Sequence, residues 1–226
     1  MSDVSTETQK NKKKEPSRPP FRLDTPLPDK LTDFCAGVIH RSKDGLLEFA
    51  CVPYRCDGTG KEVIKLAGGM GKKGESPART VSREIHEELG VKIEEGDFHF
   101  VFASPVLRSQ ERPDHIKLFF VVATEIKQPL RTTPYDAETG IPQWVPPEWL
   151  KLNLFGVHKE AFPKAIDFLL QYFLKHKNLE GLLAAVSSGL LEPDNKIKGL
   201  LLQRALKDPN FALSNACLLE EIGVGQ

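Results

Sequence analysis

Residues 68–91 read GGMGKKGESPARTVSREIHEELGV, a glycine-rich loop followed by a segment of helical character. Ser76 followed by Pro77 predicts the start of a helix, because serine is a good N-cap and proline fits the first helical turn. Gly90 predicts its end, since glycine adopts the left-handed conformation that closes many helices. The stretch therefore predicts one helix over residues 76–89.

Three acidic side chains of this helix fall on one face, because Glu84, Glu87 and Glu88 are spaced i, i+3 and i+4. Like charges this close destabilise a helix unless a cation neutralises them. Carboxylate oxygens in such a cluster suit Mg²⁺ or Mn²⁺. The spacing indicates a metal site, although three glutamates so placed also occur on ordinary solvated helix faces. The glycines of the preceding loop allow backbone groups to approach a metal or a phosphate.

The whole stretch resembles the Nudix family. The family's box consists of Gly, five residues, Glu, seven residues, and then Arg-Glu-aliphatic-any-Glu-Glu-any-Gly-aliphatic. Every fixed position is met, by Gly69, Glu75, Arg83, Glu84, Ile85, Glu87, Glu88, Gly90 and Val91. One departure is Ala67, which precedes the paired glycines where the family often has proline. The resemblance extends more weakly over residues 33–150.

The resemblance implies an α/β (α+β) fold, an α/β/α sandwich around a mixed sheet. It also implies an enzyme that hydrolyses a nucleoside diphosphate linked to another moiety. The implied ligands of Mg²⁺ or Mn²⁺ are Glu84, Glu87 and Glu88, with the Gly68 carbonyl as a further ligand. The metal would neutralise the pyrophosphate and lower the pKa of a bound water.

The resemblance also implies roles for residues around the metal. Glu75 and Arg83 are expected to be the supporting pair that fixes the loop to the helix. A carboxylate must accept the proton of the attacking water. Either a glutamate of the box or Glu111, on a later loop, is the candidate for this general base.

Substrate choice in the family is set outside the box. The markers of the NADH, coenzyme A and diadenosine-polyphosphate types are missing. The ADP-ribose type carries a proline downstream of the box, close to the position of Pro105, and a glutamate in the following loop, as at Glu111. ADP-ribose or another nucleotide sugar is therefore the expected substrate, and Arg108 and Arg112 are candidates for binding its phosphate oxygens.

Short apolar runs on both sides of the box predict strands and later helices. The predicted strands cover 34–40, 46–54, 62–66, 98–106, 115–124 and a short segment at 144–145. The predicted helices after them cover 158–176, 179–191, 195–207 and 211–222. One helix among several strands, followed only by helices, predicts a mixed sheet with a C-terminal helical extension.

The chain is expected to divide into three parts. Residues 1–30 carry almost no apolar side chains before Phe21, which predicts a disordered N-terminal arm. Residues 31–176 would form the Nudix hydrolase domain, and residues 177–226 the helical extension. The extension would act as an accessory cap or as a dimerisation element.

Composition excludes several classes of protein. The 226 residues carry 31 basic and 31 acidic side chains, so the chain as a whole does not attract nucleic acid or an anionic membrane. Its 4 cysteines are too few and too irregular for a disulfide framework or a zinc site. No apolar run reaches the length of a membrane helix, and the first residues lack the core of a signal peptide. A cytoplasmic protein with a small-molecule partner is expected.

A second hypothesis is a Nudix-like ligand sensor or protein-binding module that uses its helical C-terminal region. The intact box favours the enzyme. The acidic residues of 179–226 outnumber the basic ones, which weighs against reading DNA. A protein partner or a homodimer stays open, because the apolar faces of these helices need some surface to cover them.

Overall fold

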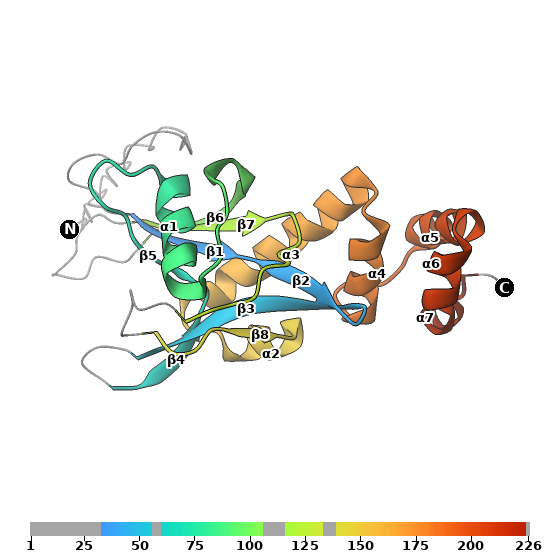
Figure 1. Cartoon of the computed structure of the whole chain (residues 1–226), viewed down its shortest axis with the longest axis horizontal. Coiled ribbons are helices and arrows are strands. Elements are labelled where there is room, and N and C mark those ends of the chain that lie inside the picture. The colour runs from blue at the N-terminus through green and yellow to red at the C-terminus, as the bar shows by residue number, and fades with distance from the viewer. Residues whose placement is uncertain (1–32, 56–59, 106–115, 133–138, 225–226) are drawn as a thin grey trace, which may run out of the picture.

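A computed structural model describes residues 33–55, 60–105, 116–132 and 139–224 (Figure 1). Its strands form two sheets of four strands each. The first has the order β5 (Gly68–Met70), β1 (Phe34–Val38), β7 (Ile116–Val122) and β6 (Phe98–Pro105). The second contains β2 (His40–Lys43), β3 (Leu46–Arg55) and β4 (Glu62–Lys65), with β8 (Gln143–Val145) also paired to β3. Among the strands of these described ranges, β1 and β7 are the one pair that runs parallel, so the predicted mixed sheet is confirmed.

Helices cover both faces of the first sheet. Helix α1 (Pro77–Leu89) packs on one face, where its apolar side chains join those of alternate strand residues such as Cys35, Leu118 and Phe120. Helix α3 (Val157–His176) packs on the other face, against residues such as Phe119. The predicted α+β sandwich is confirmed. The remaining helices are η1 (Glu95–Asp97), α2 (Pro147–Asn153), α4 (Leu179–Ser187), α5 (Asn195–Lys207), α6 (Pro209–Ser214) and α7 (Ala216–Glu221).

Helix α1 begins and ends as its sequence predicts. The Ser76 side chain accepts a hydrogen bond from the Arg79 amide at 3.1 Å, and Gly90 closes the helix with φ of 69°. The helix approaches the sheet closely at Gly37, where a Cβ would lie 2.5 Å from the tip of Ile85. A glycine in β1 thus sets the distance between the box helix and the sheet.

Several predicted elements differ from the observed ones, among them the helix predicted over 179–191, which ends at Ser187. The predicted strand 34–40 contains the whole of β1 and the first residue of β2, because the chain changes sheets after Val38. The glycine-rich loop begins with the short strand β5, which pairs with β1. The predicted helix 211–222 is two short helices, α6 and α7, separated at Asn215.

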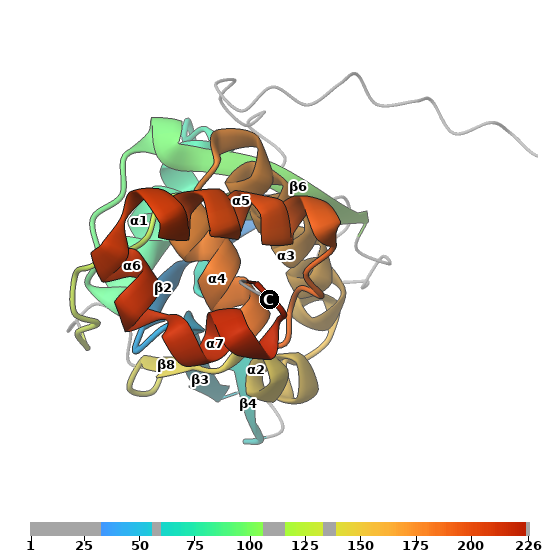
Figure 2. The ribbon, with the colours of Figure 1, turned by 90° about the vertical axis from the view of Figure 1, so that its right-hand side faces the viewer.

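The C-terminal helices have an apolar cluster of their own. Side chains of α4, α5, α6 and α7 and of the residues just after α7 form it, and its buried members are Leu183, Ile197, Leu201, Phe211, Leu219 and Val224. Figures 1 and 2 show α5, α6 and α7 at one end of the molecule, beyond α4. The predicted arm 1–30 lies outside the described residues. Among the helices that are described, none is long and apolar enough to cross a membrane.

His40 is a buried histidine without a hydrogen bond. Neither ring nitrogen has a partner within the described part of the chain, and the ring packs between Phe49 and Phe173 at centroid distances of 6.3 and 5.6 Å. Burial lowers the pKa of His40 to about 4, because the charged ring would be poorly solvated there. The folded protein therefore holds this ring neutral.

We expect acidification to lower the free energy of unfolding through His40. The folded state takes up a proton at His40 only near pH 4, whereas the ordinary pKa is 6.5, so between these values the unfolded state binds more protons. Stability then rises with pH, and His40 accounts for a loss of about 2 kcal/mol between pH 8 and pH 5. Urea unfolding at both pH values, for wild type and His40→Leu, measures this loss. Equal losses in the two proteins would contradict the prediction.

Candidate functional site

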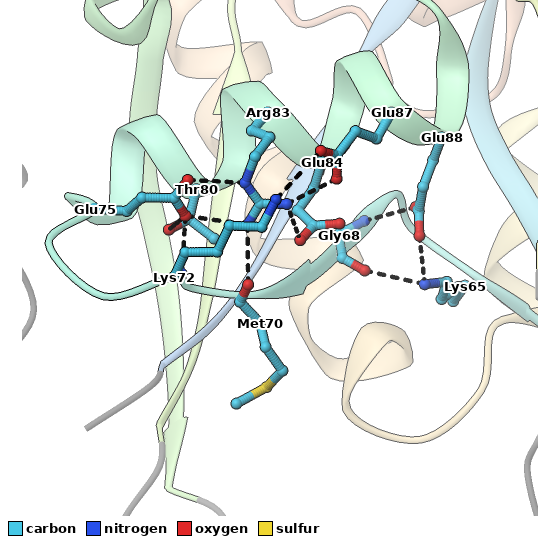
Figure 3. A network of polar contacts seen from close by, with 10 residues as sticks. All are labelled: Lys65, Gly68, Met70, Lys72, Glu75, Thr80, Arg83, Glu84, Glu87 and Glu88. Atoms are coloured by element: carbon cyan, nitrogen blue, oxygen red, sulfur yellow. Dashed lines mark hydrogen bonds and ion pairs between the residues drawn. The ribbon is translucent and has the colours of Figure 1, made fainter. Parts of the chain in front are cut away.

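Arg83 is the centre of the site, and its guanidinium contacts three carboxylates (Figure 3). Its Nε and Nη2 donate to the two carboxylate oxygens of Glu75 at 2.8 and 3.0 Å. Its Nη1 donates to Glu84 at 2.6 Å and to Glu87 at 2.7 Å. Nη2 also donates to the Met70 carbonyl at 2.9 Å. One largely buried side chain therefore joins α1 to the loop that precedes it.

Glu75 is fixed by both the loop and the helix. Besides the contact with Arg83, its Oε2 accepts hydrogen bonds from the Lys72 amide at 2.9 Å and from the Thr80 hydroxyl at 3.2 Å. Burial by itself raises the pKa of Glu75, but the bonds from Arg83 and Lys72 outweigh it and bring the pKa to about 2. Glu75 therefore stays ionised beside Arg83. The resulting ion pair connects the loop to α1.

Glu88 lies one turn further along α1, and its side chain is only 1% exposed. Its Oε2 accepts a hydrogen bond from the Gly68 amide at 2.8 Å, and its Oε1 contacts Lys65 Nζ at 2.7 Å. Lys65 Nζ also donates to the Gly68 carbonyl at 3.0 Å. The structure brings Glu88 and Gly68 together and adds Lys65, which the sequence did not indicate.

Burial raises the pKa of two glutamates in this cluster. For Glu88, burial outweighs the neighbouring Lys65 and brings the pKa to about 7. For Glu84, burial outweighs Arg83, and the pKa is again above its usual value. Carboxylates with poorly solvated charges are stabilised most by a nearby cation. The electrostatics of both groups therefore favour the binding of positive charge.

The acid cluster is neutralised by cations of the protein itself. Within the described residues, no three His, Cys, Asp or Glu side chains are arranged to hold a metal ion. Instead Arg83 Nη1 bridges Glu84 and Glu87, and the Lys65 ammonium contacts Glu88. The same carboxylate oxygens are hard ligands of the kind that Mg²⁺ and Mn²⁺ prefer. The donor set fits a divalent ion once these side chains move.

Two glycines keep space for the cluster. A Cβ on Gly69 would lie 2.5 Å from the carboxylate of Glu84, so a larger residue would displace that carboxylate. A Cβ on Gly68 would run into the Cys35 carbonyl and Ala36 of β1. The paired glycines therefore allow β5 to pass between β1 and the acidic face of α1.

Several predicted site residues are not placed by the structure. Glu111, Arg108 and Arg112 belong to the segment 106–115, which lies outside the described residues. Pro105 ends β6, where its backbone is paired with Ile116 of β7. The structure therefore brings together the residues of the box and Gly68, and leaves the later loop as a prediction.

A second lysine that the sequence did not indicate, Lys117, lies on the face of the sheet opposite α1. Its Nζ is 5.3 Å from the ring centroid of Phe34, and the ring of His158 contacts the same Phe34 at 5.7 Å. Burial lowers the pKa of His158 to about 3, and the charges of Lys117 and Lys65 lower it in the same direction. No sequence signal reveals Lys117, because the pairing of β7 with β1 places it there.

Comparisons with known proteins agree with this architecture. The model of the NUDIX domain matches residues 36–165. A search of curated proteins finds no match. Similar solved structures include a MutT/nudix family protein from Enterococcus faecalis, with 14% identity, a TM-score of 0.52 and coverage of 84% of this chain and 82% of that chain. Another is the NUDIX domain of Shewanella oneidensis NrtR in complex with ADP ribose, with 17% identity, a TM-score of 0.51 and coverage of 63% and 90%.

Identities this low show the fold alone, and the family rests on the family model. That model spans more than half of the chain and contains the whole Arg83 network, from Met70 to Glu87, together with the contact between Glu88 and Gly68. The protein therefore belongs to the Nudix hydrolase family.

Proposed function

We propose that this protein is a metal-dependent pyrophosphohydrolase that cleaves a nucleoside diphosphate linked to another moiety. The observation that supports this most is the gathering of Glu84, Glu87 and Glu88 around cationic groups on one face of α1. Mg²⁺ or Mn²⁺ bound there would neutralise charge on the pyrophosphate and lower the pKa of the attacking water.

The residues of the chain itself would orient the reaction. Arg83 bonds to the carboxylates of Glu84 and Glu87 and, when a metal takes their oxygens, would stay beside them through its two contacts with Glu75. The proton of the attacking water must pass to a carboxylate, for which Glu111 and the box glutamates are the candidates. Lys65, which contacts Glu88 and Gly68, adds positive charge that would favour an anionic substrate.

For the substrate we propose ADP-ribose or another nucleotide sugar. The position of Pro105, with a glutamate in the following loop, supports the ADP-ribose type. Arg108 and Arg112 of that loop would bind phosphate oxygens. The complex of the Shewanella oneidensis NUDIX domain with ADP ribose supports the compatibility of this nucleotide with the fold.

A hydrolysis screen tests this function. The purified protein would be incubated with ADP-ribose, nucleotide sugars, dinucleotides and nucleoside triphosphates, each with Mg²⁺ or Mn²⁺, and the products identified. With metal, we expect ADP-ribose or a nucleotide sugar to be cleaved to two monophosphates. Without metal, we expect no products. Comparing Glu111→Gln with wild type on that substrate then tests Glu111 as the general base.

The same screen separates the enzyme from a ligand sensor. Nucleotide binding without turnover under any condition would favour a sensor that signals through its C-terminal helices. For the enzyme we propose a cytoplasmic location and no nucleic-acid partner, which cell fractionation and a DNA-binding assay would check. The extension is proposed as a cap or a homodimer contact, and the mass of the protein in solution distinguishes the two.

A further inference from the structure

Lys65 occupies a position between two of the proposed metal ligands. Its Nζ lies 2.7 Å from Glu88 Oε1 and 3.0 Å from the Gly68 carbonyl oxygen (Figure 3). Both oxygens are groups that we expect to bind Mg²⁺ or Mn²⁺. The Lys65 ammonium, which is positively charged as the metal would be, therefore contacts two of the proposed metal ligands.

Burial makes this contact strong. The side chain of Lys65 is 11% exposed and that of Glu88 is 1% exposed, so water screens the pair poorly. A divalent ion that used the same two oxygens would lie within a few ångströms of the ammonium. Two cations so close in a weakly screened site repel one another strongly. The metal and the ammonium therefore compete for Glu88 and Gly68.

Lys65 has an alternative place for its charge. Its Nζ is 4.7 Å from the ring centroid of Tyr54, and an aromatic face attracts an ammonium. The lysine side chain also has a flexible stem, so its head group can move without any movement of β4. An ammonium released from Glu88 would stay beside the site, where an anionic substrate would attract it.

Lys72 provides a contrast within the same acid cluster. Its Nζ lies 3.5 Å from Glu87 Oε1, but its side chain is 63% exposed. Water screens this pair and the lysine can leave at little cost. Removing the charge of Lys72 should therefore affect a metal much less than removing the charge of Lys65.

We propose that Lys65 is an internal cation that competes with the divalent metal for Glu88 and Gly68 and lowers metal affinity in the absence of substrate. This inference rests on the proposed metal-dependent function. Lys65 is a positioning residue here, because it acts through a metal ligand. Once displaced, its ammonium faces the pyrophosphate, so that the metal and Lys65 both neutralise the substrate.

The test is the affinity for Mn²⁺ in the absence of nucleotide, measured by electron paramagnetic resonance of the free ion at pH 8. Lys65→Met should bind Mn²⁺ at least about tenfold more tightly than wild type, since the competing charge is gone. Lys72→Met is the matched control, and its affinity should change by less than about threefold. Lys65→Gln, whose amide can still donate to Glu88, should shift in the same direction and serves if Lys65→Met does not fold.

Each outcome has a distinct meaning. Tighter binding by the Lys65 variants alone supports the inference. Equal or weaker binding by these variants, with measurable binding by wild type, overturns the role of Lys65 and leaves the proposed function intact. An equal gain in Lys72→Met also overturns it, because general charge removal would then explain the effect. If no variant and no wild-type protein binds Mn²⁺, the proposed function fails together with the inference.

Discussion

Replacing Glu88 with glutamine is expected to lower kcat/KM for the substrate found in the screen by about 10²- to 10³-fold. The substitution removes one negative charge from the proposed metal position and leaves the size of the side chain unchanged. Steady-state kinetics over a range of Mg²⁺ concentrations measures the loss, which should persist at saturating metal if Glu88 also acts in the reaction.

The fold should survive this substitution. Burial already raises the pKa of Glu88 to about 7, so the protein holds this carboxylate at an energetic cost that a neutral amide does not have. The amide oxygen can still accept the hydrogen bond of the Gly68 amide, and Lys65 keeps its bond to the Gly68 carbonyl. Circular dichroism and thermal unfolding should therefore resemble those of wild type.

Glu94→Gln is the matched control for Glu88→Gln. Glu94 is an exposed acid a few residues after α1 and takes no part in the Arg83 network. Its substitution removes the same charge and should leave kcat/KM within about twofold of wild type, as surface changes usually do. Full activity of Glu88→Gln would show that the assignment of this metal ligand is wrong.

The box helix was predictable because its signals are local. Ser76, Pro77 and Gly90 set its ends through contacts within a few residues, and the i, i+3, i+4 spacing sets which acids share a face. The contact between Glu75 and Arg83 followed from the resemblance, since an eight-residue separation alone does not fix it. The structure realises that contact in a bidentate geometry.

Lys65 and the strand β5 were not predictable, because both depend on long-range pairing. Glycine has a low intrinsic propensity for strands. Gly68 nevertheless pairs with β1, because the two backbones approach more closely than a Cβ on Gly68 would allow. Lys65 reaches Glu88 only because the chain passes from the end of β4 into β5 beside α1, where Glu88 also accepts the Gly68 amide. The order of charges along the sequence does not reveal this long-range contact between Lys65 and Glu88.

Arg83→Met is expected to lower the free energy of unfolding by about 3 kcal/mol in metal-free buffer. Arg83 has a side chain that is 17% exposed, and it is shared by Glu75, Glu84 and Glu87. Its loss leaves three carboxylates close together with little solvent, and leaves the Met70 carbonyl without its donor. Urea unfolding with a chelator present measures the change.

Arg79→Met is the matched control, since Arg79 lies one turn earlier on the same helix with an exposed side chain. Its stability should stay within about 0.5 kcal/mol of wild type. Saturating Mg²⁺ or Mn²⁺ should restore part of the stability of Arg83→Met, because a divalent ion can neutralise Glu84 and Glu87 in place of the guanidinium. A loss of equal size in the two variants would mean that Arg83 is an ordinary surface charge. A loss specific to Arg83→Met that metal does not reduce would mean that the acids need the shape of the guanidinium fork and not only its charge.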